Sequence, residues 1–154
     1  MLVKKGRALL FVFLFASVFL ALPSLAAQGN TGGSDPIGIV GITVDELIRR
    51  FGAPRSVYAV RGLEEWQDDV VFVYEHGDFY IFKDRVWQAG VKELRSIKAG
   101  DTRGAVSMAL GSAAEIRGNS MFYPVSDYPW PLMLRYDFDS SGRVRVIFIT
   151  RTDF

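Results

Sequence analysis

The chain of 154 residues contains no cysteine, and its single histidine is His76. The absence of cysteine excludes disulfide bonds, so stability must come from packing alone. It also excludes the acylated cysteine that anchors bacterial lipoproteins to a membrane. No serine stands in a G-x-S-x-G setting, so a nucleophile and a base cannot be assembled in a usual way. We therefore expect a protein that is not an enzyme.

Two acidic segments are the remaining places to look for chemistry. The four carboxylates between residues 64 and 69 surround Trp66 and could form a catalytic pair, but a solvated loop is the favoured interpretation. Residues 137–142 imitate the first half of a calcium loop, yet position twelve of that frame is Phe148, where glutamate is required. This segment is predicted to be a hairpin turn. No metal ion or cofactor is expected.

Long hydrophobic runs are absent except near the start of the sequence. Positive charges at residues 4–7 precede the apolar stretch 8–22, and small residues that a signal peptidase reads follow it. The stretch is shorter than the roughly 20 residues of a transmembrane helix. We expect residues 1–26 to be a signal peptide cleaved after Ala26 or Ala27, with an uncleaved anchor as the alternative. Residues 27–36 read as a flexible leader. The protein is thus predicted to be secreted or periplasmic, with no stable membrane anchor after cleavage.

A surplus of positive charge is also missing. The formal net charge of +1 depends on three basic residues in the signal segment, and the rest has 15 basic against 17 acidic residues, a balance of −2. Nucleic acid as a partner is not expected, because such proteins carry a basic surplus. The remaining chain is long enough for a single domain, or for two half-domains that share a core.

An internal repeat is the main positive signal. Gly-x-Thr, an apolar segment and a further glycine occur twice, at a constant offset of 59 residues: Gly41, Thr43 and Gly52, then Gly100, Thr102 and Gly111. Thr43 and Glu46 form a capping box, and the apolar residues from Val44 to Phe51 follow helical spacing. β-Branched and aromatic runs follow each helix. They are expected to form strands over residues 56–61, 70–75, 79–83, 85–91, 120–125, 132–138 and 143–150.

These patterns predict an α+β fold of two tandem repeats, at residues 37–95 and 96–154. Each repeat is a short helix followed by an antiparallel β-meander, and the helices pack on one face of the sheet. Alternation over residues 132–138 and 143–150 indicates a sheet with one buried face and one wet face.

The tandem pattern resembles the β-lactamase inhibitory proteins, and single copies are similar to the small outer-membrane assembly lipoproteins of the SmpA/OmlA type. The segment HGDFYIF at residues 76–82 resembles the Gly-Asp-aromatic hairpin of the inhibitors, and SMFYPVSDYP at 120–129 resembles their aromatic loop. The resemblance implies that Asp78 enters the active site of a β-lactamase and stands in for the substrate carboxylate. The inhibitors' disulfides and long second-repeat insertion have no counterpart here, so part of their contact surface is missing.

From the residues themselves, Gly77 and Asp78 are predicted to form the two-residue loop of a hairpin, because glycine in the first position suits a type II′ turn. Asp78 would then stand at a rigid tip, although aspartate is also simply a good turn residue. On this register Tyr74, His76 and Phe79 share one face and Tyr80 lies on the other. Only one face can lie under the helices, and the sequence leaves open which. Aromatic rings on the other face, if it is exposed, typically mark an interaction surface. The alternative is that the neighbouring repeat or the loop at residues 63–69 covers this second face.

The segment 121–131 is rich in aromatic residues and proline, which is typical of a binding loop. Tyr123, Tyr128 and Trp130 are therefore further candidates for partner contacts. The alternative is that Tyr123 and Trp130 fold back as a lid over the core.

Two functions remain open. The first is an exported, non-enzymatic protein-binding module, which would be an inhibitor if its partner is a secreted or periplasmic enzyme such as a β-lactamase. The second is a scaffold factor for envelope or outer-membrane assembly.

Overall fold

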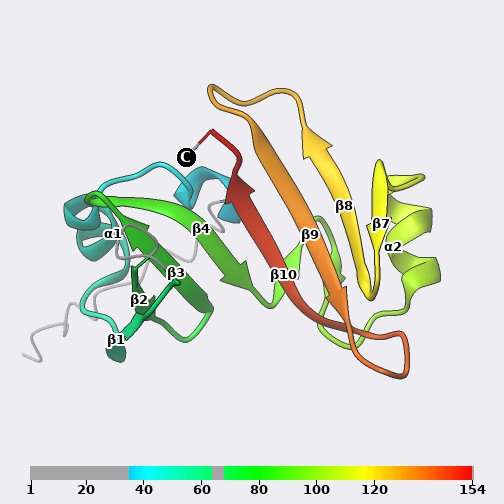
Figure 1. The fold of residues 1–154 in the computed structure, drawn as a ribbon, viewed down its shortest axis with the longest axis horizontal. Helices are drawn as coiled ribbons and strands as arrows, with labels where there is room; N and C mark the ends of the chain where they lie inside the picture. Colours follow the sequence, from blue (N-terminus) through cyan, green and yellow to red (C-terminus); the bar gives the residue numbers. More distant parts are fainter. Residues whose placement is uncertain (1–34, 64–67, 154) are drawn as a thin grey trace, which may run out of the picture. The chain divides into compact units, whose positions relative to one another are not determined.

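An eight-stranded antiparallel sheet organises the part of the chain that the structure describes, residues 35–63 and 68–153 of a computed structural model (Figure 1). The strand order is β1-β2-β3-β4-β10-β9-β8-β7, and a two-stranded ribbon of β5 and β6 is separate. The helical elements are η1 (Pro36–Ile39), α1 (Val44–Phe51) and α2 (Arg103–Leu110). The strands are β1 (Ser56–Val60), β2 (Asp69–Val73), β3 (Gly77–Phe82), β4 (Arg85–Val91), β5 (Glu93–Leu94), β6 (Ile97–Lys98), β7 (Glu115–Arg117), β8 (Ser120–Val125), β9 (Leu132–Phe138) and β10 (Val144–Arg151).

The α+β class and both predicted helices are confirmed, and each predicted strand segment contains a strand. Elements η1, β5, β6 and β7 are not predicted by the sequence, because elements of two to four residues are too short to show a period. The predicted signal peptide, most of the leader and the centre of the acidic loop at 64–67 lie outside the described residues.

Strands β4 and β10 join the two halves of the sheet. They pair antiparallel, from Val91 opposite Ile147 to Gln88 opposite Thr150. As a result β1–β4 lie on one side of this junction and β7–β10 on the other.

Residues related by the 59-residue offset make equivalent hydrogen bonds. The Arg85 guanidinium donates to the carbonyl of Gly41 at 2.9 Å, and Arg143 donates to the carbonyl of Gly100 at 2.9 Å. In each case the arginine begins or precedes the last strand of its half. The same loop carbonyl is therefore held in the same way twice.

A second pair of hydrogen bonds recurs at the helix ends. The Tyr74 hydroxyl donates to the carbonyl of Gly52 at 2.9 Å, and the Tyr123 hydroxyl donates to the carbonyl of Gly111 at 3.3 Å. Carbonyls after a helix need partners from outside it, because no further turn follows. A buried tyrosine supplies that partner in each half.

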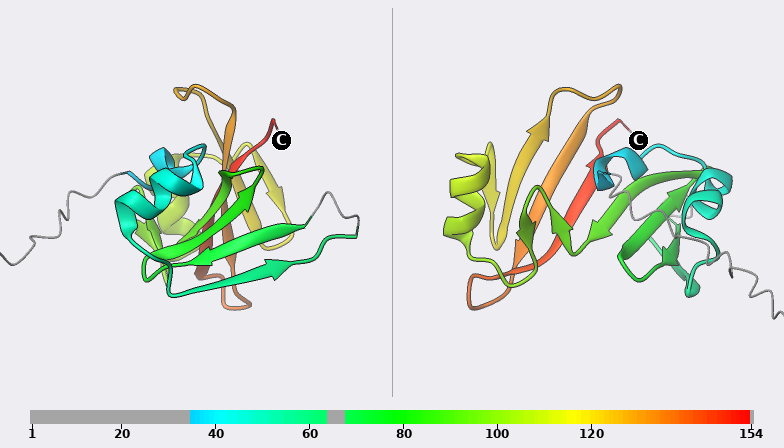
Figure 2. Two further views of the ribbon diagram at one scale, coloured as in Figure 1. Left: turned by 90° about the vertical axis from the view of Figure 1, so that its left-hand side faces the viewer. Right: turned by 180° about the vertical axis from the view of Figure 1, so that it is seen from behind.

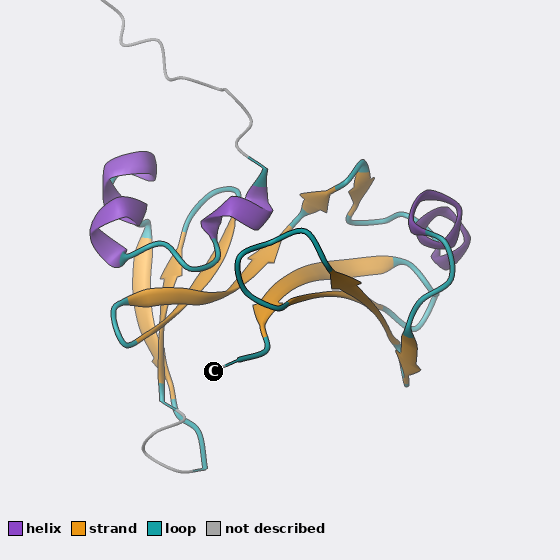
Figure 3. Ribbon diagram, turned by 90° about the horizontal axis from the view of Figure 1, so that it is seen from above, coloured by secondary structure: helices purple, strands orange, loops and turns teal. Residues whose placement is uncertain are grey.

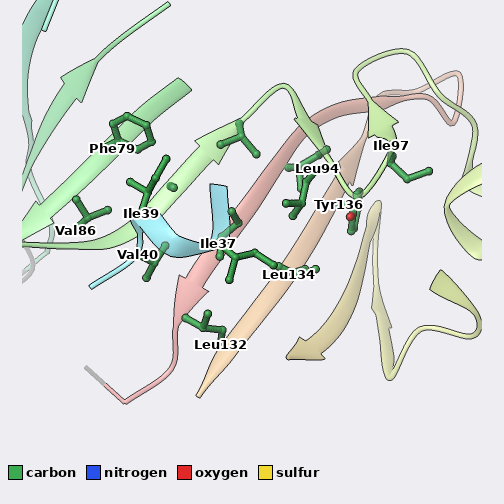
Figure 4. Close-up of a cluster of buried hydrophobic side chains, with 14 of the residues drawn as sticks. Ile37, Ile39, Val40, Phe79, Val86, Leu94, Ile97, Leu132, Leu134 and Tyr136 are labelled. Carbon is green, nitrogen blue, oxygen red and sulfur yellow. The ribbon is translucent and has the colours of Figure 1, made fainter. Parts of the chain in front are cut away.

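The core is one cluster of buried side chains, and Figure 4 shows part of it, with Ile37 and Ile39 of η1 together with strand residues such as Phe79 and Leu134. Leu47 of α1 and Val106 of α2 are fully buried in it. Along β9 buried residues alternate with half-buried Met133, Arg135 and Asp137, as the sequence pattern predicts. No polar or charged residue is buried within residues 35–63 and 68–153. Packing alone thus accounts for the interior of this disulfide-free chain.

The two helix N-termini differ in one contact. Thr43 Oγ accepts from Glu46 N at 3.2 Å and Thr43 N donates to the Glu46 carboxylate at 3.1 Å, which completes the predicted capping box. The Thr102 hydroxyl accepts from Ala105 N at 3.2 Å, but alanine cannot reciprocate. We expect Thr43→Ala to lower the unfolding free energy by about 1–2 kcal/mol and Thr102→Ala by about 1 kcal/mol or less. Urea unfolding measures both, and equal losses would contradict the role given to Glu46.

Candidate functional site

The predicted hairpin tip is the first part of the site that the structure corrects. Asp78 lies inside β3, opposite Val73 of β2, and Tyr74 N donates to Gly77 O at 2.9 Å. The two residues at the tip are therefore Glu75 and His76, and the prediction of a Gly77–Asp78 loop is wrong.

Strand pairing, and not turn geometry, explains the glycine at position 77. A Cβ at Gly77 would stand 2.5 Å from the carbonyl oxygen of Gly90 in the neighbouring strand β4. Gly77 has no left-handed backbone angle of the kind that a type II′ turn requires. Glycine is present because the two backbones approach closely.

This register places three of the predicted contact residues on the core side. Phe79 is fully buried and Tyr74 retains 7% of its exposure, so neither can offer much surface to a partner. The His76 side chain is exposed at the tip, and its ring lies 4.7 Å from the ring of Phe51. Partial burial lowers the pKa of His76, against the opposing charge of Glu75.

Asp78 and Tyr80 lie on the opposite face of the sheet, which we call the open face. The pairing register gives one row across this face: Ser56, Val73, Asp78, Gly90, Phe148, Arg135, Phe122 and Glu115. The row crosses all eight strands, and residues on one side of a sheet in one row are neighbours. Asp78 is therefore part of a broad surface and not of a protruding tip.

Aromatic rings and an arginine form a continuous strip on the open face. The rings of Trp87 and Tyr80 are 6.5 Å apart and those of Tyr80 and Phe148 are 6.3 Å apart, both edge to face. The guanidinium of Arg135 lies 4.3 Å from the centre of the Phe148 ring. Partial burial raises the pKa of Tyr80 further above its ordinary value, and the neutral hydroxyl can donate a hydrogen bond. All four side chains are half-buried.

Gly90 makes room for this strip. A Cβ at Gly90 would lie 3.2 Å from the ring of Phe148, which occupies the space that a side chain on β4 would fill. The ring of Phe148 therefore reaches over β4 toward Tyr80 of β3, while Arg135 of the neighbouring strand β9 lies on its other side.

Charged groups border the strip. Arg135 is 3.1 Å from the carboxylate of Asp137, which also accepts a 2.6 Å hydrogen bond from the Ser120 hydroxyl. Further along, Arg117 lies over the ring of Phe122 at 5.1 Å. Aromatic residues and arginine are the side chains that protein interfaces contain in excess over the rest of the surface.

A depression of about 370 Å³ lies at the Asp78 end of this surface, and its charged lining residues are Arg55, Glu75, Asp78, Lys92 and Arg145. Arg55 pairs with Glu75 at 2.7 Å, and Lys92 Nζ donates to the backbone oxygen of Glu75 at 3.3 Å. Asp78 and Arg145 form no ion pair among the described residues.

The aromatic loop does not join this surface. Tyr123 is buried in the core, in the register row of Leu134, on the side away from Asp78. Trp130 packs against Gly41, since a Cβ there would stand 2.2 Å from its ring, and Tyr128 lies 5.5 Å from Trp130. Tyr123 and Trp130 thus fold back onto the core, which was the alternative interpretation of this loop.

The described residues contain no group of histidine and carboxylate side chains that could hold a metal ion. Asp139 accepts from the backbone nitrogens of Ser141 and Arg143 at 2.8 and 3.0 Å, which makes the predicted hairpin turn. Of the acidic loop, Asp69 accepts from the Trp87 indole at 2.9 Å, and burial raises its pKa. Both described acidic segments thus have structural roles.

Strand register is the information that sequence reasoning lacked. The alternation along β9 and β10 already placed Arg135 on the wet face, but no local signal indicates that β4 pairs with β10. That pairing brings Phe148 beside Tyr80 and makes the strip.

No known protein family and no curated protein matches this chain. Two solved structures are similar. The first is an extracellular protein containing an SCP domain from Bacillus anthracis, at 13% identity and a TM-score of 0.54, over 98% of this chain and 50% of that one. The second is a DUF4309 family protein, YjgB, from Bacillus subtilis, at 13% identity and a TM-score of 0.49, over 71% of this chain and 78% of that one.

This chain spans about half the length of the SCP-domain protein, and the likeness to it shows a shared fold. Neither structure is a β-lactamase inhibitory protein or an outer-membrane assembly lipoprotein. None of the helices within residues 35–63 and 68–153 is long and apolar enough to cross a membrane.

Proposed function

We propose that this chain is an exported, non-enzymatic module that binds a protein partner through the open face of its sheet. The single observation that carries the proposal is the strip of Trp87, Tyr80, Phe148 and Arg135. Tryptophan, tyrosine and arginine are enriched among the residues that carry most of the binding energy in protein interfaces.

We further propose that the architecture is two tandem repeats with their helices on one face. The equivalent arginine and tyrosine hydrogen bonds of the two halves support this interpretation. In Figure 3 the helical elements are drawn on the same side of the strands. Such an arrangement leaves the other side of the sheet free for a partner.

The occupant of the open face is proposed to be a folded protein. The strip and the depression beside Asp78 together offer rings, guanidinium groups and carboxylates over a broad area, which suits a protein surface better than a small molecule. The resemblance to the β-lactamase inhibitory proteins makes a secreted or periplasmic enzyme the first partner to test. Inhibition would follow if Asp78 or the strip covers that enzyme's active site.

The test is a pull-down from the secreted and envelope fractions with the purified protein and three variants, followed by affinity measurement on the captured partner. Tyr80→Ala and Phe148→Ala each remove one ring of the strip and are expected to weaken binding about tenfold or more. Tyr128→Ala is the matched control, because it removes a half-buried tyrosine on the aromatic loop. It is expected to bind as the unchanged protein does.

Melting temperatures of all variants must first agree closely, so that a loss of binding is not a loss of folding. If Tyr128→Ala loses the partner and Tyr80→Ala retains it, the partner binds the aromatic loop, and the proposal that it binds the open face is wrong. A further variant, Asp78→Ala, separates the strip from the depression beside Asp78. If this variant binds the partner as tightly as the unchanged protein does, the partner contacts the strip and does not need the Asp78 carboxylate.

A further inference from the structure

The two edge strands of the sheet differ in how they are protected. Strand β7 has three residues, and two of them, Glu115 and Arg117, are charged and form an ion pair at 2.6 Å. Short, charged edge strands discourage the addition of another strand. This edge of the sheet is therefore closed to further pairing.

Strand β1, at the other edge, has none of these protections. Its five residues, SVYAV, include no charge and no proline, and all five are exposed. Val57, Tyr58 and Val60 retain 51%, 46% and 39% of their exposure. Figure 2 shows β1 along the outside of the sheet in the left-hand view. An exposed apolar edge strand presents unpaired backbone amides and carbonyls to a further strand.

We propose that β1 pairs antiparallel with β1 of a second copy of this chain, around a two-fold axis at Tyr58, to form a symmetric dimer. In this register Tyr58 faces Tyr58 of the second copy, Val57 faces Ala59, and Ser56 faces Val60. Each pair lies on one side of the sheet, because side chains alternate along a strand. No charged residue faces another within the paired segment, and a two-fold contact must be complementary to itself in this way.

The residues that flank β1 are compatible with the same register. Arg55 of one copy would approach Arg61 of the other, and two bare guanidinium groups would repel. Within each chain, however, Arg55 pairs with Glu75 at 2.7 Å and Arg61 pairs with Asp68. Each corner of the dimer contact is therefore neutralised within its own chain, so that the flanking arginines do not oppose the self-complementary pairing of the uncharged strand.

Pairing at β1 would join the open faces of both molecules. Tyr58 lies in the row of Val71 and Tyr80. The row would continue across the axis into the second copy, so the dimer would present two strips on one continuous sheet. The dimer does not depend on the proposed function, but it would make partner binding bivalent.

Sedimentation velocity over a wide concentration range tests the dimer. We expect the mass of the purified protein to rise from monomer to dimer and to stop there. Val57→Lys places a charge on the edge and is expected to weaken dimerisation about tenfold or more. Ile116→Lys is the matched control on β7, where Ile116 is 63% exposed, and is expected to leave dimerisation unchanged. A monomer at all concentrations, growth beyond a dimer, or equal effects of both lysines would overturn the proposal.

The absence of cysteine allows a direct test of the register. Tyr58→Cys places one thiol of each copy next to the axis, where directly opposite residues of antiparallel strands are close enough for a disulfide. We expect rapid formation of a covalent dimer on mild oxidation. Ser56→Cys, which would face Val60, and Ile116→Cys should remain largely monomeric. Equal crosslinking of all three would overturn the pairing around Tyr58.

Discussion

Gly41→Ala is expected to destabilise the protein by roughly 2–5 kcal/mol. Two costs add. The backbone of Gly41 has a φ of +99°, which disfavours an L-residue by about 1–2 kcal/mol. The new Cβ would also stand 2.2 Å from the ring of Trp130, and overpacking of this kind costs about 1–3 kcal/mol. Urea unfolding measures the loss, and Trp130 should shift its fluorescence.

Gly100→Ala is the matched control, because Gly100 is related to Gly41 by the repeat offset. Its φ is +96°, and a Cβ there would meet nothing within 4 Å. Its substitution should therefore show the backbone cost alone, about 1–2 kcal/mol. Equal losses for the two variants would mean that Trp130 moves aside without cost, and that the aromatic loop is not held against Gly41.

Above pH 10 the folded state is expected to lose roughly 2–3 kcal/mol of stability through Tyr136. Burial raises the pKa of Tyr136 from 10 to about 12. The neutral hydroxyl is thus favoured in the folded state, and its contribution is complete below pH 10 and lost as pH rises to about 12. Two pKa units correspond to about 2.7 kcal/mol. Denaturant unfolding between pH 8 and pH 12 measures the decline.

Tyr136→Phe isolates this effect from the other groups that titrate at high pH. The Tyr136 hydroxyl is buried and finds no hydrogen-bond partner among the described residues. Its removal is therefore expected to leave stability at pH 7 unchanged or about 1 kcal/mol higher, and to flatten the decline above pH 10. A variant that declines as steeply as the unchanged protein would contradict the role of Tyr136. A large loss at pH 7 would show that the hydroxyl is satisfied in solution.

Local sequence signals were reliable for the individual elements. Thr43 and Glu46 identified the start of α1, and the alternation around Leu134 identified β9 and its buried face. These features depend on residues three or four positions apart in a helix and two apart in a strand, so a short window contains all the information. The α+β class can be predicted from such short segments, because the chain twice has one helix followed by several strands.

The candidate site was predicted less well. Asp78 and Tyr80 lie on the open face, but Phe79 and Tyr74 belong to the core. The grouping of Tyr74 with Phe79 on one face and Tyr80 on the other is as predicted, and the structure adds which of the two faces is buried. A separate error concerns Gly77, whose glycine predicts a turn on the sequence alone. In the structure it permits close approach of the carbonyl of Gly90, a residue from another strand. The tip lies at Glu75 and His76, two residues before the predicted position, so Asp78 is a strand residue and not a tip residue.

The sequence by itself determined the α+β class, the positions of both helices and most strands, and the alternation that separates a buried face from an open one. It did so because these properties arise from hydrogen bonds and side-chain spacing within a few residues. Only the tertiary structure decided that β4 pairs with β10, that Phe148 and Arg135 join Tyr80 on one surface, and that Trp130 closes over Gly41. Those contacts join residues far apart in the chain, and their register depends on packing that no local pattern records.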